Sequence, residues 1–389
     1  MPQMTPTAET RFFEFRDPDR PLRLMTGPVL DRFTLAYEVY GRLNASRDNA
    51  VLLFHAMTGS QHAAGWNPEV PGLGDRWSEE LHEGWWDGFV GPGRAIDTDR
   101  YCVICANYLG GCYGSTGPAS IDKTAGRPWG PAFPVLRMRD IVESQMRLLD
   151  HLGIRRLHAA IGASIGGFLC QLTATRYPDR VGIVIPIGTG VETTISQRIL
   201  NFEEVSAIEQ DPFFRGGDYY DGPPPAQGLS LARRIAHKTF VSLEALRERA
   251  RGEVVSTRPP YGWYEMNHPV ESYLLHQGDK FVRRFDANSY LRILDAWQWF
   301  DLAREAEADD IVEAFSRCRD QEFLVFSIDS DLSFQPAEQA KLVQLLKVAR
   351  VPVMWITVHS DKGHDSFLLE PRLFTPHIQQ ALENRPLGS

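Results

Sequence analysis

Short apolar runs rich in β-branched and aromatic residues recur along the chain, separated by segments with helical periodicity. The runs begin at Phe33, Ala50, Tyr101, Leu157, Val181, Glu322 and Pro352. Several are almost continuously apolar, as expected for strands that are covered by helices on both faces. The segment from Arg139 has apolar residues three and four positions apart, which is typical of an amphipathic helix. This alternation predicts a mostly parallel central sheet in an α/β fold.

The alternation stops between about Glu192 and Arg304. This region contains helix-like segments, no convincing strand, and a proline-rich connector over residues 221–228. We interpret it as a helical lid inserted into the core. The sequence therefore predicts three parts: residues 1–191 and 306–389 as the two portions of an α/β core, and residues 192–305 as the lid.

Composition and charge exclude several classes of protein. The 389 residues carry a net charge of -9 without a block of basic residues, which argues against binding to nucleic acid. The N-terminus has no apolar segment typical of a secretory signal, and no apolar run is long enough to cross a membrane. Five cysteines are an odd number and do not suggest a disulfide framework. We expect a cytoplasmic protein that binds neither nucleic acid nor membranes.

Cys102 and Cys105 form a C-x-x-C pattern inside one of the predicted strands. Because side chains alternate along a strand, an odd separation places the two thiols on opposite faces of the sheet. No second pair of ligands accompanies them. We therefore expect neither a redox pair nor a metal site.

Gly162-Ala163-Ser164-Ile165-Gly166 matches the G-x-S-x-G pattern of a nucleophile elbow. It follows the apolar strand from Leu157 and precedes a helix-like segment, which is the context that this motif requires. Glycines stand two positions before and two positions after the serine because the turn is too tight for a Cβ atom there. The sequence thus predicts an α/β-hydrolase fold with Ser164 as its nucleophile.

A serine nucleophile needs a histidine base that a carboxylate orients. In α/β-hydrolases the acid and then the histidine follow the serine along the chain. Asp331 and Asp329 both lie at the end of the strand from Glu322, and their spacing does not separate them. His364, in the loop after the last strand, has the best position for the base. His359 is the runner-up, and we expect it to pack against the strand.

The oxyanion hole should combine the backbone N–H of Ile165 with one from the loop after an earlier strand. The segment A-V-L-L-F-H-A-M-T-G-S-Q supplies that loop, with Met57 or Thr58 as the second donor. His55 stands alone at the end of this strand. We expect it to be structural rather than a metal ligand, and we expect no metal in the site.

Six motifs together resemble the homoserine O-acetyltransferase family over about residues 37–367. They are H-A-M-T-G-S-Q-H-A-A-G-W, the long block from G-W-W-D-G to P-A-S-I-D, G-A-S-I-G-G, A-R-R-I-A-H-K-T-F, E-S-Y-L-L-H-Q-G-D-K-F-V-R-R-F-D-A-N-S-Y-L and G-H-D-S-F. The resemblance implies an α/β-hydrolase core with a helical lid, often dimeric through that lid. It also implies a ping-pong reaction with acetyl-CoA as co-substrate and no permanently bound cofactor.

The resemblance also assigns roles to residues. It places the nucleophile at Ser164, the base at His364 and the acid at Asp331, in preference to Asp329. It assigns the oxyanion donors to the amides of Met57 and Ile165. It further implies that Arg233 holds the carboxylate of the acceptor, and that Asp365 faces the amino group of the acceptor.

Three departures from the family pattern surround the expected acceptor pocket. Ala163 and Ile165 flank the serine where relatives have G-G-S-M-G-G. Phe240 stands where relatives carry a tyrosine, and residues 332–335 replace L-F-P-P. Two hypotheses remain open: an O-acyltransferase that acetylates homoserine or a related hydroxyl compound, and a hydrolase of small acetyl esters. A third hypothesis, a non-catalytic protein of this fold, conflicts with the presence of both Ser164 and His364.

Overall fold

A computed structural model describes residues 7–252, 263–266 and 268–388. Its central sheet has eight strands in the order β1-β4-β8-β5-β11-β12-β13-β14. They are β1 (Arg11–Arg16), β4 (Arg32–Tyr40), β8 (Cys102–Ala106), β5 (Ala50–Phe54), β11 (Leu157–Ala163), β12 (Val181–Ile187), β13 (Glu322–Ile328) and β14 (Val353–Val358). The strands from β8 to β14 run parallel, and β1 and β4 are antiparallel to their neighbours. The predicted α/β-hydrolase fold is confirmed, with each predicted strand present.

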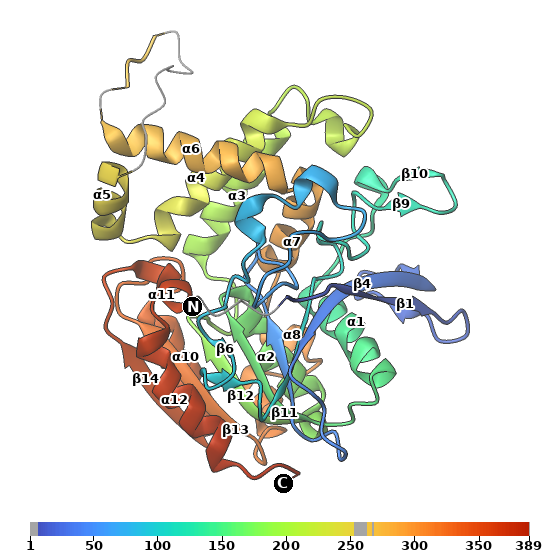
Figure 1. Cartoon of the computed structure of the whole chain (residues 1–389), viewed down its shortest axis with the longest axis vertical. Coiled ribbons are helices and arrows are strands. Elements are labelled where there is room, and N and C mark those ends of the chain that lie inside the picture. Colours follow the sequence, from blue (N-terminus) through green and yellow to red (C-terminus); the bar gives the residue numbers. More distant parts are fainter. Residues whose placement is uncertain (1–6, 253–262, 267, 389) are drawn as a thin grey trace.

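Helices cover both faces of the sheet (Figure 1). One face packs against α1 (Met138–His151), α2 (Ile165–Arg176), α9 (Ile311–Ser316) and α10 (Pro336–Val348). The other face packs against α12 (Pro371–Asn384), which follows α11 (Ser366–Leu369). Each face forms its own hydrophobic cluster because the apolar side chains of the inner strands alternate between the two layers. Two-stranded pairs join β2 (Leu22–Arg23) to β3 (Val29–Leu30), β6 (Val90–Gly91) to β7 (Ile96–Asp97), and β9 (Ile121–Asp122) to β10 (Arg127–Pro128).

The chain between β12 and β13 contains helices in place of strands, in the region predicted as a lid. They are α3 (Ile195–Glu209), α4 (Ala226–Phe240), α5 (Leu243–Gly252), α6 (Pro269–Arg284), α7 (Ala287–Gln298) and α8 (Leu302–Glu305). Helix α4 packs against both α3 and α6. Figure 1 shows α4, α5 and α6 beyond one end of the sheet, on the side where α11 lies.

The structure corrects two details of this region. One of the helix-like segments of the sequence, residues 289–303, was expected to continue as a helix, but it breaks at Trp299, whose backbone leaves the helical conformation. Asp301 then caps α8 through Arg304 N–H. Helix α6 was not predicted as an element, although it begins with a capping box formed by His268 and Glu271.

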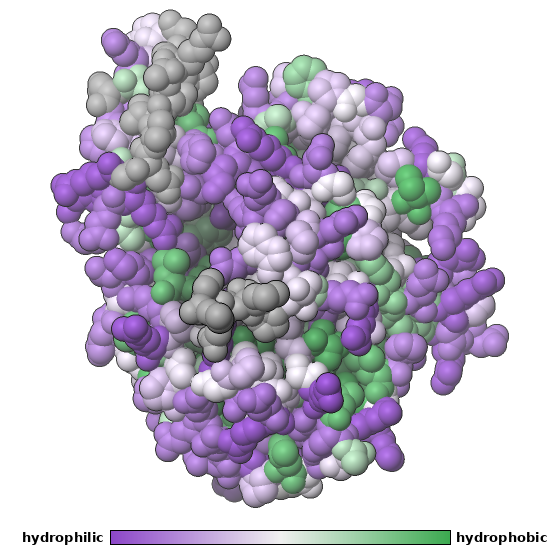
Figure 2. All heavy atoms as spheres, in the orientation of Figure 1, coloured by the Kyte–Doolittle hydropathy of each residue, from purple (hydrophilic) through white to green (hydrophobic). Residues whose placement is uncertain are grey.

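The surface of the face shown in Figure 2 is mostly hydrophilic, with hydrophobic side chains in small patches. Among the described residues, no helix has both the length and the apolar character needed to span a bilayer. All five cysteines are buried and unpaired. Cys102 and Cys105 lie in the hydrophobic clusters on opposite faces of the sheet, as their spacing predicted.

Candidate active site

Ser164 occupies a strained turn between β11 and α2. Its φ of 58° and ψ of -130° lie in a region that residues other than glycine rarely adopt. Close approach of the backbone explains the flanking glycines. A Cβ on Gly162 would lie 2.1 Å from Gly166 O, and a Cβ on Gly166 would lie 2.5 Å from Phe54 O. The packing of α2 against the end of β5 therefore brings the turn at Ser164 next to the loop that contains Met57.

Asp331 and His364 form a buried pair at the ends of β13 and β14. Oδ2 of Asp331 lies 2.6 Å from Nδ1 of His364. The other carboxylate oxygen, Oδ1, accepts hydrogen bonds of 2.8 Å from the backbone N–H groups of Ser333 and Phe334. These bonds fix the carboxylate, which in turn holds the Nδ1–H tautomer of the imidazole and leaves Nε2 as the basic atom.

The environment of His364 is consistent with a general base. Burial disfavours the charged ring, but the negative charge of Asp331 and its hydrogen bond outweigh this effect and raise the pKa above its ordinary value of 6.5. The ring packs against Phe334, Phe240 and Phe367. Within the described part of the chain, Nε2 is buried without a hydrogen-bond partner. No bond to Ser164 is formed in this conformation, so the base has a free lone pair.

The competing acid and base form a separate pair at the surface. Asp329 Oδ2 lies 2.8 Å from His359 Nδ1, and 83% of the His359 side chain is exposed. The expectation that His359 packs against the strand is wrong, because the chain turns outward directly after β14. The structure thus separates Asp331 from Asp329 by direction: the first faces the buried His364 and the second faces solvent.

The predicted oxyanion donors lie at the start of α2 and in the loop after β5. Ile165 is the first residue of α2, so its N–H has no partner within the helix. Met57 occupies the turn after β5, in which Gly59 N–H donates to Ala56 O across 2.9 Å. Among the described residues, no cluster of side chains is arranged to hold a metal ion. His55 lies with its ring stacked on Tyr108 at 3.6 Å, which agrees with a structural histidine.

Three comparisons with known proteins identify the family. A model of the alpha/beta hydrolase fold matches residues 49–371. The homoserine O-acetyltransferase of Rhodospirillum rubrum is 45% identical, over 94% of this chain and 90% of that protein. The homoserine O-succinyltransferase of Alkalilimnicola ehrlichii is 42% identical, over 92% of this chain and 91% of that protein. The chain belongs to the homoserine O-acyltransferase family.

A solved structure supports the same assignment. The homoserine O-acetyltransferase from Bacillus anthracis superposes with a TM-score of 0.86 at 26% identity, covering 99% of this chain and 100% of that one. The resemblance predicted from the six motifs is confirmed, and the chain is an enzyme of the O-acyltransferase type. Relatives named as acetyltransferases and as succinyltransferases match to similar extents. Sequence identity therefore does not select the acyl group.

The residues that the resemblance to the family assigns to binding the acceptor lie near one another and near His364. The Arg233 guanidinium carbon lies 5.5 Å from the centre of the Phe240 ring, which in turn lies 6.2 Å from the centre of the His364 ring. Burial raises the pKa of Asp365, and the nearby positive charges of His364 and Arg233 offset this only in part. Helix α4 thus brings Phe240 next to His364, and Arg233 next to Phe240.

The contacts that join helices α3 and α6 to the loops after β13 and β5 were not predicted from the sequence. Arg284, at the end of α6, donates to Thr58 O at 3.3 Å. Gln197, in the first turn of α3, donates to Ser333 O at 2.9 Å. The partners are 226 and 136 residues apart, and no local pattern in the sequence marks such pairs.

Proposed function

We propose that this enzyme transfers an acetyl group from acetyl-CoA to the hydroxyl group of homoserine or a related hydroxyl compound. In the first half-reaction, Ser164 Oγ attacks the thioester carbonyl while His364 Nε2 accepts the hydroxyl proton. The same proton then passes to the departing CoA thiolate, and an acetyl ester remains on Ser164. The N–H groups of Met57 and Ile165 stabilise the negative charge on the tetrahedral intermediate. No cofactor or metal remains bound between turnovers.

The second half-reaction reverses these steps with a new partner. His364 removes the proton from the acceptor hydroxyl, which attacks the acetyl ester. The bond to Ser164 breaks, and the serine recovers the proton from His364. Asp331 keeps the imidazole in the required tautomer throughout.

The environment of Arg233 carries the proposal of an amino-acid acceptor. Its guanidinium lies 5.0 Å from the centre of the Phe281 ring and 5.5 Å from that of Phe240. Among the described residues, no carboxylate forms an ion pair with it. A planar cation held between aromatic rings without a partner fits a bidentate contact with the carboxylate of a substrate. Asp365 lies close enough to interact electrostatically and would face the amino group of the same substrate.

The surroundings of Arg284 favour acetyl over succinyl as the transferred group. A succinyl chain ends in a carboxylate and needs a cation near the acyl site. Arg284 contacts the oxyanion loop, but its Nε already pairs with Glu80 Oε1 at 2.9 Å. This pair, which Lys280 Nζ shares at 3.1 Å, offsets part of the charge of Arg284 and holds its guanidinium against the protein. An uncharged acetyl group makes no such demand.

Phe240 supports a second candidate, the hydrolysis of small acetyl esters. Its ring lies beside His364 and offers no hydroxyl to bind the acceptor, so water has less competition for the acyl-enzyme. The chemistry of the two functions differs only in the molecule that attacks the acetyl-Ser164 ester.

Product analysis distinguishes these candidates. The enzyme is incubated with acetyl-CoA or succinyl-CoA, with and without L-homoserine, and the products are quantified by mass spectrometry. We expect O-acetylhomoserine as the main product and little reaction with succinyl-CoA. Acetate released at the same rate with and without homoserine would instead establish the hydrolase. A succinyl ester as the main product would overturn the choice of donor.

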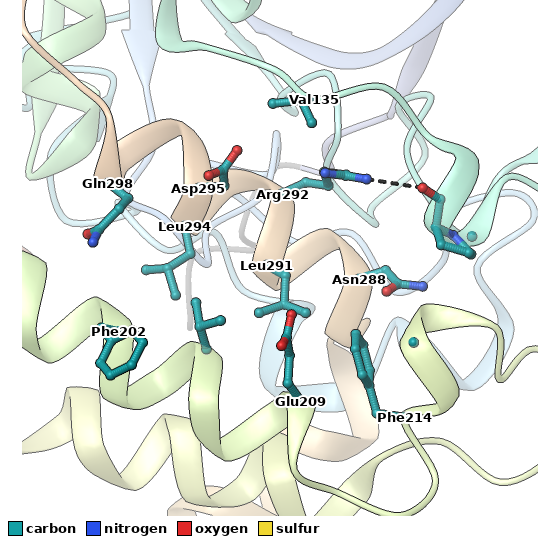
Figure 3. A pocket seen from close by; sticks show the side chains of 14 residues that line it. Val135, Phe202, Glu209, Phe214, Asn288, Leu291, Arg292, Leu294, Asp295 and Gln298 are labelled. Carbon is teal, nitrogen blue, oxygen red and sulfur yellow. Dashed lines mark hydrogen bonds between the residues drawn. The ribbon is translucent and has the colours of Figure 1, made fainter.

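We also propose that two copies associate through the lid, in the cytoplasm, without nucleic acid or membrane partners. Ile195, Ile199 and Phe202 lie on one face of α3 and are 73%, 57% and 66% exposed. Beside them, a cavity of about 620 Å³ lies between α3 and α7 (Figure 3). An exposed apolar stripe next to a cavity is typical of an association surface. We expect a Phe202→Glu variant to sediment as a monomer and the wild type as a dimer. A wild type that also sediments as a monomer would refute the association.

A further inference from the structure

The loop after β5 is a tight turn in which the position of one carbonyl controls the direction of one N–H group. Ala56 C=O and Met57 N–H belong to the same peptide unit, which is planar, so the two groups point in opposite directions. Ala56 O accepts the Gly59 N–H at 2.9 Å. Whatever holds this oxygen therefore also directs the N–H that is the predicted oxyanion donor.

The side chain of His55 is the second group that holds Ala56 O. Nδ1 of His55 lies 2.7 Å from this oxygen. A carbonyl oxygen only accepts, so Nδ1 carries the proton. The ring is fully buried and stacks on Tyr108 with an angle of 19° between the planes. Stacking fixes the plane of the ring, and the bond to Ala56 O selects the orientation in which Nδ1 faces this oxygen.

The protonation state of His55 suits this role. Burial lowers the pKa of His55 to about 4, so the ring is neutral at the pH of the reaction. Its single proton is on Nδ1, and within the described residues Nε2 has no hydrogen-bond partner. The ring thus adds a directed donor to the loop without adding a charge beside the reacting serine.

Two further bonds fix the same loop on either side of the peptide unit. The Tyr108 hydroxyl donates to His55 O. Arg284 donates to Thr58 O at 3.3 Å and to the Tyr113 hydroxyl oxygen at 2.7 Å. Three of the four carbonyls of residues 55–58 are therefore held by side chains or a turn bond, and the exception is that of residue 57.

We propose that His55 is a positioning residue, which aims the Met57 N–H at the oxyanion that forms when Ser164 is acylated and deacylated. The inference rests on the proposed acyl-enzyme function. It assigns His55 a role in turnover beyond packing, although the side chain touches neither substrate nor nucleophile. The bond from Nδ1 to Ala56 O is the contact through which it acts.

A pair of variants with side chains of similar shape tests this role. In His55→Asn, the amide nitrogen takes the place of Nδ1 and retains the donor. In His55→Leu, a methyl group takes that place and the donor is lost. Acetyl transfer is measured for both as kcat and KM, together with the rate of inactivation by a serine-reactive phosphonate and the melting temperature.

We expect His55→Leu to lower kcat and the phosphonate reaction rate by about 10- to 100-fold, a fraction of the loss caused by removing an oxyanion donor outright. KM for acetyl-CoA should change little. His55→Asn should stay within about threefold of the wild type in kcat, despite a similar fall in melting temperature, because it retains the donor. A purely structural role predicts equal losses in both variants, or none, and either result would overturn the proposal.

A second variant covers the case in which His55→Leu does not fold. A Cβ on Gly59 would lie 2.9 Å from Cβ of His55 and 3.2 Å from its Nδ1. Gly59→Ala should displace the ring and reduce kcat without raising KM, and an unchanged kcat would count against the proposal.

Ser164→Ala distinguishes a failure of the proposed function from a failure of the role of His55. If that variant remains active, the proposed function fails; if it is inactive while His55→Leu turns over normally, only the role of His55 fails.

Discussion

His364 donates from Nδ1 to Oδ2 of Asp331 across 2.6 Å, in a pair that is almost completely buried. The same two strands end in a second carboxylate–imidazole pair, Asp329 with His359, which is exposed to solvent. Both pairs join a carboxylate to an imidazole, but one faces the protein interior and the other faces solvent. They therefore offer a matched test of which acid works with Ser164.

Replacing Asp331 should have a much larger effect than replacing Asp329. In Asp331→Asn the amide oxygen stays with the N–H groups of Ser333 and Phe334, so the NH2 group faces Nδ1 of the histidine. That group donates and selects the wrong tautomer, and we expect kcat to fall by about 10³- to 10⁴-fold. Asp329→Asn should change kcat by less than about threefold, since exposed ion pairs contribute little. Steady-state acetyl transfer measures both. A comparable loss in both variants would contradict the assignment of the acid.

The rate of acetyl transfer should decrease on the acid side of neutrality. Only the neutral imidazole of His364 accepts a proton, and its pKa lies above 6.5 because Asp331 stabilises the charged form against the effect of burial. The midpoint of the decrease in kcat/KM should therefore lie above pH 6.5. In Asp331→Asn the residual activity should show this midpoint at a lower pH. A wild-type midpoint below 6.5 would argue against the charged pair.

The same pair should affect stability with the opposite dependence on pH. A raised folded-state pKa means that the native protein binds the proton more tightly than the unfolded chain. The contribution of the pair is fully present below pH 6.5 and is lost as the pH rises through the folded-state pKa. Urea unfolding of wild type and Asp331→Asn at pH 6 and pH 9 measures it. The difference in the free energy of unfolding should be larger at pH 6.

Arg233 should affect the acceptor and leave the donor unchanged. Arg233→Lys retains the charge but loses the planar bidentate contact, and we expect KM for homoserine to rise by about tenfold or more. KM for acetyl-CoA should stay within about twofold, because the proposed contact is made with the acceptor alone. Arg234→Lys, on the next position of the same helix, is the control. Equal shifts in both variants would remove Arg233 from the acceptor site.

The glycines of the nucleophile turn should be essential for stability. Gly166→Ala would place a methyl group 2.5 Å from Phe54 O and 2.9 Å from His55 O, so the loop or the helix must move. We expect a loss of about 3 kcal/mol or more in the free energy of unfolding. Gly27→Ala has no atom within 4 Å of its Cβ but a φ of 109°, and it should cost about 1 kcal/mol through backbone strain alone. Urea denaturation compares the two.

Much of the core could be predicted because its elements have local signatures. The inner strands are apolar on both faces, so runs such as residues 157–163 and 181–187 are visible without tertiary information. The elbow at Ser164 combines a strand, two required glycines and a helix within a few positions. The order of acid and histidine along the chain then led to Asp331 and His364.

The remaining features depend on contacts between distant parts of the chain. Strand β1 alternates exposed and buried residues at the antiparallel edge of the sheet, and its short pattern was not recognised near the N-terminus. The exposure of His359 depends on the direction of the chain after β14, which the sequence does not encode locally. The bonds that hold the oxyanion loop come from His55, Tyr108 and Arg284, which only the fold brings together.

The most direct test of this account is to locate the acyl group on the enzyme. The protein is mixed with acetyl-CoA, quenched in acid within one turnover, digested, and analysed by peptide mass spectrometry. We predict one acetyl group on the peptide that contains Ser164, its removal when homoserine is added before the quench, and its absence in Ser164→Ala. An unlabelled peptide in an active enzyme, or a label that persists in the presence of homoserine, would contradict the acyl-enzyme mechanism.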